Sequence, residues 1–225
     1  MDGAGARPPH EGARTGAVGD AGADREYLAT HVPASTDDIS ERYLKRAIAE
    51  INELANEIAQ AAGPERPTVL GSGHPQADIL LLKYGPQAAE LHEGVAFFGR
   101  AGQAVLKSIQ RLGVDPMAIY GTNCLKYEDE DEEEAHGFLT RELYIVQPKL
   151  VVVMGQDALQ CLNATRFPLA TEVEETPGTL QRFTPTIEAI VTPDLDASLD
   201  EQGAKKAFWE AFKAIGPWFS ELPPY

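Results

Sequence analysis

The sequence predicts an α/β fold, a three-layer α/β/α sandwich with a central, mostly parallel sheet of four strands. One observation is that two short runs, 79–82 and 150–154, are apolar at every position, which is typical of strands buried on both faces. The other is that segments with apolar residues at every third or fourth position separate such runs. Strands that alternate with helices pair in parallel, with helices on both faces of the sheet.

Each element follows from its own local pattern. A long helix is expected to begin near Ser35 and Thr36, which are good N-cap residues, and to end at Gly63 and Pro64. The other expected strands are 120–122 and 187–191, and the other expected helices start near residue 101, run through 138–145, follow Gly155 and close the chain over 208–219.

Composition bounds the size and the class of the protein. Of the 225 residues, 43% are hydrophobic, which suffices for one core. Residues 1–34 are rich in Gly, Ala, Pro and Asp, so we expect a disordered N-terminal tail there and one domain over 35–225. Two cysteines, Cys124 and Cys161, without a metal-like spacing indicate a reduced, cytoplasmic protein. No apolar run approaches the roughly 18 residues that cross a bilayer, so no membrane partner is expected.

The charge balance weighs against tight binding to duplex DNA. The net charge is −16, with 35 acidic residues against 19 basic ones, and proteins gain affinity for DNA by neutralising phosphates with Lys and Arg. The simplest interpretation is a solvated acidic surface. The densest part of it, the run 128–134, suits an exposed helix start or a docking patch for a protein partner.

Ligands of parallel α/β sheets bind beyond the carboxyl ends of the strands. The candidate loops are therefore 83–99, 122–127, 155–158 and 192–198. Five short blocks lie in and around these loops, in the order Val69-Leu-Gly-Ser-Gly, Ala77-Asp-Ile-Leu-Leu, Phe97-Phe-Gly-Arg-Ala-Gly102, Tyr120-Gly-Thr-Asn-Cys-Leu-Lys126 and Pro148-Lys-Leu-Val-Val-Val-Met-Gly-Gln-Asp-Ala158. In this order and spacing they make the chain, over about residues 44–219, similar to the uracil-DNA glycosylase superfamily, most of all to its iron–sulfur, thermophile-type branch.

The resemblance implies a pocket for a base that is taken out of the DNA stack. Phe97 falls where the family places the ring that stacks on uracil, and Asn123 where it places the amide that reads the edge of the base. Tyr84, Gly85 and Pro86 fall on the family's Gly-Glu-x-Pro-Gly loop and join the expected base-binding residues. Without the resemblance, Phe97 is equally well a core residue, and Asn123 a turn or cap residue.

Two catalytic groups of the branch are replaced. Tyr84 stands where the family has its water-activating acid, and Asp194 stands where it has the histidine that stabilises the departing base. A carboxylate there repels the charge that develops on that base. The remaining candidates for holding a water are Asp194 and Glu90. The alternatives are that Glu90 and His92 belong to a solvated loop and that Asp194 caps a helix or forms a turn.

The cluster of that branch is not expected in this chain. It needs four thiolates, and the chain has two cysteines. Tyr127 takes the place of one family cysteine, and no cysteine lies near 61–63, where a Cys-x-x-Cys pair would stand. No cofactor and no metal site are therefore expected.

Three functions stay open at this point. The first is a glycosylase with altered catalytic residues that removes uracil or another damaged base from DNA. The second is a catalytically degenerate member that binds a nucleobase, a nucleotide or a protein partner. The third, which the order of the blocks opposes, is an unrelated Rossmann-like ligand binder. Alkali-sensitive abasic sites in uracil-containing DNA distinguish the first from the second.

Overall fold

A computed structural model describes residues 35–223 of the chain. The chain divides into two compact units, 1–42 and 43–225. Of the first, the described part is the opening of a helix, where the Ser35 hydroxyl accepts a hydrogen bond from the Asp38 amide at 3.2 Å and the Asp38 carboxylate accepts one from the Ser35 amide at 3.1 Å. The predicted N-cap is thereby confirmed. The tail expected over 1–34 lies outside the described residues.

The elements follow the predicted alternation of helices and strands. In chain order they are α2 (Thr36–Ala62), β1 (Ser72–Gly73), β2 (Ile79–Lys83), α3 (Ala88–Glu93), α4 (Arg100–Arg111), the 3-10 helix η1 (Pro116–Ala118), β3 (Ile119–Asn123), α5 (Glu132–Val146), β4 (Leu150–Met154), α6 (Gln156–Ala164), β5 (Leu180–Arg182), β6 (Glu188–Thr192), α7 (Leu195–Ser198), α8 (Gln202–Phe212) and α9 (Ile215–Ser220).

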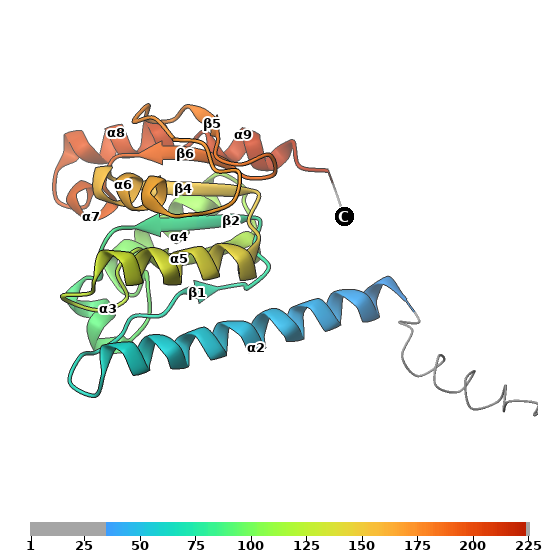
Figure 1. The fold of residues 1–225 in the computed structure, drawn as a ribbon. Coiled ribbons are helices and arrows are strands. Elements are labelled where there is room, and N and C mark those ends of the chain that lie inside the picture. Colours follow the sequence, from blue (N-terminus) through green and yellow to red (C-terminus); the bar gives the residue numbers. More distant parts are fainter. Residues whose placement is uncertain (1–34, 224–225) are drawn as a thin grey trace, which may run out of the picture. The chain divides into compact units, whose positions relative to one another are not determined.

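The sheet has six strands in the order β1-β3-β2-β4-β6-β5. Its four central strands run parallel, which confirms the predicted parallel core, whereas the short edge strands β1 and β5 pair antiparallel (Figure 1). The predicted number of four strands is therefore wrong. Because β1 and β5 are only two and three residues long and contain no buried residue, they carry none of the apolar pattern that identifies a strand.

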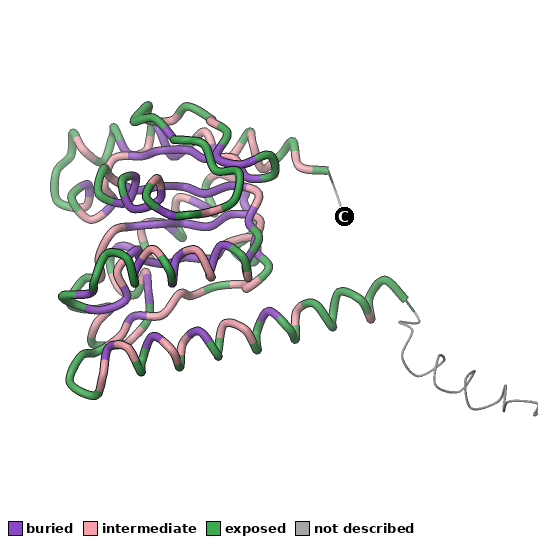
Figure 2. Tube along the Cα trace, viewed as in Figure 1, coloured by how far each residue is buried: buried purple, intermediate pink, exposed green. Residues whose placement is uncertain are grey.

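Alternate residues of the parallel strands face opposite sides of the sheet. One face, with Ile79, Leu81 and Val152, packs against side chains of α4, α8 and α9. The other, with Leu80 and Leu82, packs against α5 and α6. Figure 2 shows the parallel strands as buried segments between helices. The predicted three layers are present, and the carboxyl ends of β2 and β3 lie side by side.

Two segments differ from the expected elements. The stretch between β2 and Phe97, expected as a loop, contains the six-residue helix α3. The closing helix is two helices, α8 and α9. Pro217 lies in the first turn of α9, where it is tolerated, but it cannot continue a helix that has already begun because it has no amide hydrogen to donate. Among the described residues, no helix combines the length and the apolar character needed to span a bilayer.

A buried ion pair secures the carboxyl end of β3. The Lys126 ammonium donates to the Glu142 carboxylate at 2.5 Å, to the Thr122 hydroxyl at 2.7 Å and to the backbone oxygen of Asn123 at 2.7 Å. The Tyr120 hydroxyl also donates to Glu142, at 2.9 Å, and burial together with this carboxylate raises the pKa of the phenol. These bonds fix the backbone at the end of β3, including that of Asn123.

We expect Glu142→Gln to lower the free energy of unfolding by about 3 kcal/mol, because it leaves the Lys126 ammonium buried without its counter-ion. The matched control is Arg141→Gln on the same helix, which removes a half-exposed ion pair with Glu57 and should cost less than about 1 kcal/mol. Urea unfolding of both variants measures the two values. Equal costs would contradict the importance given to the buried pair.

Candidate functional site

Three side chains gather at the carboxyl ends of β2 and β3. Lys83 and Asn123 are register partners on these two parallel strands, so their side chains leave the same face of the sheet. Gly121, two residues before Asn123, faces the ring of Phe97, which places that ring on the same face. We call Lys83, Phe97 and Asn123 the strand-end site.

Asn123 has a buried side-chain amide without a partner. The residue is 0% exposed, and neither Nδ2 nor Oδ1 has a hydrogen-bond partner among residues 35–223. Leaving a buried polar group unpaired costs about 1–3 kcal/mol, and such groups are rare in folded proteins. The backbone oxygen of the same residue is bonded to Lys126. The backbone of Asn123 is therefore held in place, while the donors and the acceptor of its side-chain amide are unused.

Phe97 sits in an unusual backbone conformation against a glycine. Its φ angle is 61°, in the left-handed region that bulky residues avoid, and its amide donates a short hydrogen bond to the carboxylate of Glu90. A Cβ atom on Gly121 would lie 2.6 Å from Cδ2 of the ring. The ring therefore needs a glycine at 121, and Glu90 holds the backbone that presents it.

Lys83 is buried between two carboxylates. Its ammonium donates to Glu90 and to Asp196, both at 2.8 Å, and lies 5.6 Å from the centre of the Phe97 ring. The side chains of Lys83 and Glu90 are 1% and 0% exposed, whereas that of Asp196 is 19% exposed. Lys83 therefore places an ammonium group, together with its two carboxylate partners, on the same face of the sheet as the unpaired amide.

Glu90 is one of the two candidates for holding a water, but both of its carboxylate oxygens accept hydrogen bonds within the protein. The alternative of a solvated loop is also wrong for Glu90, which is fully buried, although His92 is exposed. One carboxylate oxygen of Glu90 accepts from the Phe97 amide, and the other accepts from Lys83 and from the Gln87 amide at 2.7 Å. With both oxygens engaged, Glu90 is a positioning residue for Lys83 and Phe97.

Asp194, the other candidate, is the N-cap of α7. Its Oδ1 accepts from the Ala197 amide at 2.6 Å, as the alternative interpretation expected, and its carboxylate lies beside Gly155. The residue that reaches the strand-end site from this loop is Asp196, which sequence reasoning missed, as it missed Lys83. The available signal was a lysine at the end of an otherwise apolar strand, since a charge there needs a buried partner.

Tyr84 is not brought together with the strand-end site. It packs against the core on the opposite face of the sheet and lines a cavity of about 160 Å³ with His136 and Asp157. Burial, followed by the charge of Glu132, raises the pKa of its phenol, so it is not a substitute for an ionised acid. Gly85, in the bend before α3, has open space where a side chain would stand, and Pro86 follows it half-buried.

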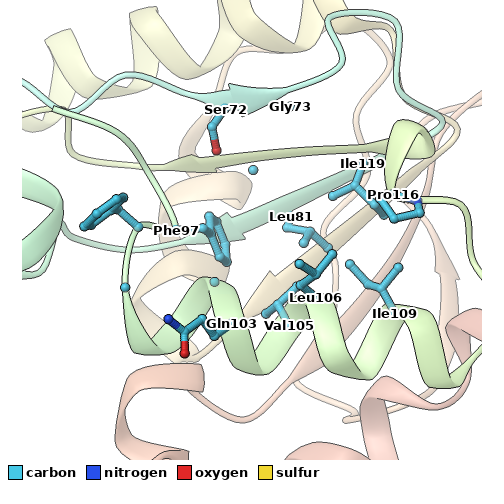
Figure 3. A pocket seen from close by; sticks show the side chains of 14 residues that line it. Ser72, Gly73, Leu81, Phe97, Gln103, Val105, Leu106, Ile109, Pro116 and Ile119 are labelled. Carbon is cyan, nitrogen blue, oxygen red and sulfur yellow. The ribbon is translucent and has the colours of Figure 1, made fainter. Parts of the chain in front are cut away.

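An apolar groove of about 500 Å³ lies next to Phe97. Figure 3 shows Leu106 and Ile109 of α4 on one side of it and Ile119 on the other. Phe97 and Gly121 belong to its lining, whereas Lys83 and Asn123 do not. The groove therefore adjoins the strand-end site at the aromatic ring, and the buried side chains of Lys83 and Asn123 do not line it.

The residues present do not fit the iron–sulfur cluster of the branch that the sequence resembles. Tyr127 and Ala62, at or near the positions assigned to family cysteines, do come together, but in an apolar cluster with Leu54, Ile58 and Phe138. The guanidinium of Arg66 lies 4.5 Å from the centre of the Tyr127 ring. Within residues 35–223, no three His, Cys, Asp or Glu side chains are grouped to hold a metal ion. The place of a cluster is filled by a tyrosine-centred apolar core.

Comparison with known proteins supports the resemblance that the sequence blocks indicate. The model of the uracil DNA glycosylase superfamily matches residues 70–214. A type-4 uracil-DNA glycosylase of Archaeoglobus fulgidus is 24% identical over 167 residues, which cover 69% of this chain and 84% of that protein. A type-4 enzyme of Sulfurisphaera tokodaii is 31% identical over 97 residues, which cover 39% of this chain and 44% of that protein. The resemblance to this branch is confirmed.

We expect Tyr127→Ala to lower the free energy of unfolding by about 3–5 kcal/mol, because it empties the apolar cluster at the end of α2. Tyr127→Phe keeps the ring and removes only the hydrogen bond to Glu134, so about 1 kcal/mol is expected. Chemical unfolding with and without a chelator measures both. A chelator that destabilises the wild type would contradict the conclusion that no cluster is needed.

The free energy of unfolding should fall as the pH rises from about 4.5 to about 7, because a buried glutamate, Glu130, ionises over this range. Glu130 is buried, one of its oxygens has no hydrogen-bond partner in the described part of the chain, and burial raises its pKa from 4.5 to about 7. Because the folded pKa is the higher one, its contribution to stability is complete below the unfolded pKa and is lost as pH rises towards about 7.

The test compares the wild type with Glu130→Gln, which retains an oxygen for the Lys126 amide. We expect the free energy of unfolding of the wild type to fall relative to the variant by about 2–3 kcal/mol between about pH 4.5 and pH 8. Urea titrations across this range measure the difference. Parallel pH profiles would show that folding does not raise the pKa of Glu130.

Proposed function

Because the chain belongs to the uracil-DNA glycosylase superfamily, we propose that it binds a base flipped out of DNA, in a role related to base-excision repair, through the amide of Asn123. The observation that carries the proposal is the buried amide without a partner. An amide offers an acceptor and two donors in one plane, which suits the edge of a pyrimidine. Phe97, seated on the same face, supplies the aromatic surface on which such a base stacks.

The proposal separates recognition from hydrolysis. Glu90 has both oxygens engaged, and Tyr84 lies on the other face of the sheet. Asp194 caps α7 with one oxygen. Its other oxygen accepts no hydrogen bond from any described side chain or amide, so any hydrolysis of the glycosidic bond is assigned to a water held there. We propose a base-binding protein with altered catalytic residues, whose hydrolysis is slow or absent.

The DNA partner is proposed to be single-stranded. The net charge of −16 opposes the phosphate contacts on which duplex binding depends. A base that is already unpaired also spares the protein the cost of extruding it. The type-4 uracil-DNA glycosylases among the relatives support DNA as the source of the base.

Asn123→Leu tests the proposal, because leucine has nearly the shape of asparagine. The variant removes an unpaired buried amide, so we expect the free energy of unfolding to stay equal or rise by about 1–3 kcal/mol. Binding to a single strand that contains one uracil should weaken about tenfold or more, measured by fluorescence anisotropy at low salt. The matched control is Asn56→Leu at an exposed position of α2, which should leave binding unchanged.

Two further measurements complete this test. Wild type that binds the uracil strand no better than the same strand with an abasic-site analogue contradicts the proposal. A loss of stability in Asn123→Leu contradicts the assignment of the amide to a ligand. Alkali treatment of the uracil strand after incubation reports hydrolysis: strand breaks that disappear in Asp194→Ala identify an active glycosylase, and no breaks identify a base-binding member.

A further inference from the structure

Lys83 is a buried charged residue at the end of an otherwise apolar strand, a position that is unfavourable for a charge. Moving an ammonium group out of water is strongly unfavourable, and its ion pairs must offset this penalty. A hydrophobic side chain could complete the otherwise apolar strand β2 at no such cost. The fold instead places a charge on the same face as Asn123, one strand away.

The ammonium is not saturated by its partners. It has three N–H donors; two are accepted by Glu90 and Asp196, and none of the described residues accepts the third. The two partners are unequal. Glu90 is enclosed and also bound to two backbone amides, whereas Asp196 is partly exposed and lies on α7, a helix of four residues. Asp196 is therefore the partner that exchanges more easily.

Asn123 alone does not discriminate between uracil and cytosine. The amide can rotate by half a turn, so it pairs either with a ring N–H beside a carbonyl, as in uracil, or with a ring nitrogen beside an amino group, as in cytosine. A neighbouring group that can only donate removes this ambiguity. An ammonium bonds to a carbonyl oxygen and is repelled by an amino group, and Lys83 is such a donor.

We propose that Lys83 is the specificity-determining residue of the strand-end site and selects a pyrimidine with a carbonyl oxygen at C4, as in uracil, over one with an amino group there, as in cytosine. When the base enters, Lys83 retains Glu90 and exchanges Asp196 for a carbonyl oxygen of the base that Asn123 binds. Asp196 competes with the base, and its pairing with Lys83 closes the site in the free protein, where Lys83 and Asn123 are both buried. This inference rests on the proposed function.

The experiment measures affinities for two single strands that differ only in one central base, uracil or cytosine, by fluorescence anisotropy at low salt. The wild type should prefer uracil. Lys83→Met keeps the length of the side chain, and we expect it to lower the affinity for uracil about tenfold or more and to bring the uracil-to-cytosine ratio close to one. The matched control is Lys213→Met, which removes an exposed ion pair with Glu210 and should leave the ratio unchanged.

Asp196→Asn gives a second, independent readout. It leaves the buried Lys83–Glu90 pair intact and weakens the competitor, so the affinity for uracil should rise severalfold while the preference for uracil remains. This variant decides the question if Lys83→Met does not fold, as judged from its unfolding curve. An affinity for uracil that stays the same or falls in Asp196→Asn would overturn the proposed exchange.

The outcomes distinguish a failure of the role given to Lys83 from a failure of the proposed base-binding function. If the wild type binds uracil through Asn123 and Lys83→Met keeps the same uracil-to-cytosine ratio, the role given to Lys83 is wrong and the proposed function stands. If the wild type shows no base-dependent binding to either strand, the proposed function is wrong and the inference falls with it.

Discussion

The carboxylate of Glu90 joins the parts on which the strand-end site depends. One oxygen holds the backbone of Phe97 and the other holds the ammonium at the end of β2. A buried charge of this kind is stable only when its lone pairs are filled, and here they are filled by Lys83 and by two backbone amides. The left-handed conformation of Phe97 is sustained by this bond, because the surroundings must over-determine a strained residue.

Much of the fold could be predicted from the sequence because its strands are buried on both faces. Runs such as 150–154 are apolar at every position, and no other local structure of that length explains them as well. The edge strands could not be predicted because two or three exposed residues carry no such pattern. The helix α3 was missed because only one of its six residues, Glu90, is buried, so it has no apolar face.

The candidate site was partly predictable for a geometric reason. Phe97 and Asn123 were expected to converge, and they lie on one face of the sheet because Gly121 and Asn123 are two residues apart on a strand. Tyr84 was expected with them, but neighbouring residues of an extended chain point to opposite faces of the sheet. Lys83 therefore lies on the face of Phe97 and Asn123, and Tyr84 lies on the opposite face. Asp196 could not be found from sequence because it is 113 residues away from its partner.

The apolar cluster around Tyr127 stabilises this part of the fold by burial, where a metal cluster would do so by ligand bonds. A metal cluster contributes binding energy only while its thiolates are deprotonated and loaded. Side chains of α2, α5 and the segment after β3 meet here through burial instead. The end of α2 is thus attached to the domain by contacts that do not depend on metal supply or on the oxidation state of cysteines.

The contact between Phe97 and Gly121 has a consequence for how this protein can vary. The ring occupies the volume that any larger residue at 121 would need. Substitutions at these two positions, which are far apart in the sequence, must therefore be correlated: a side chain can appear at 121 only where the ring at 97 has been lost or has turned away. Natural variants that keep phenylalanine at 97 should therefore also keep glycine at 121.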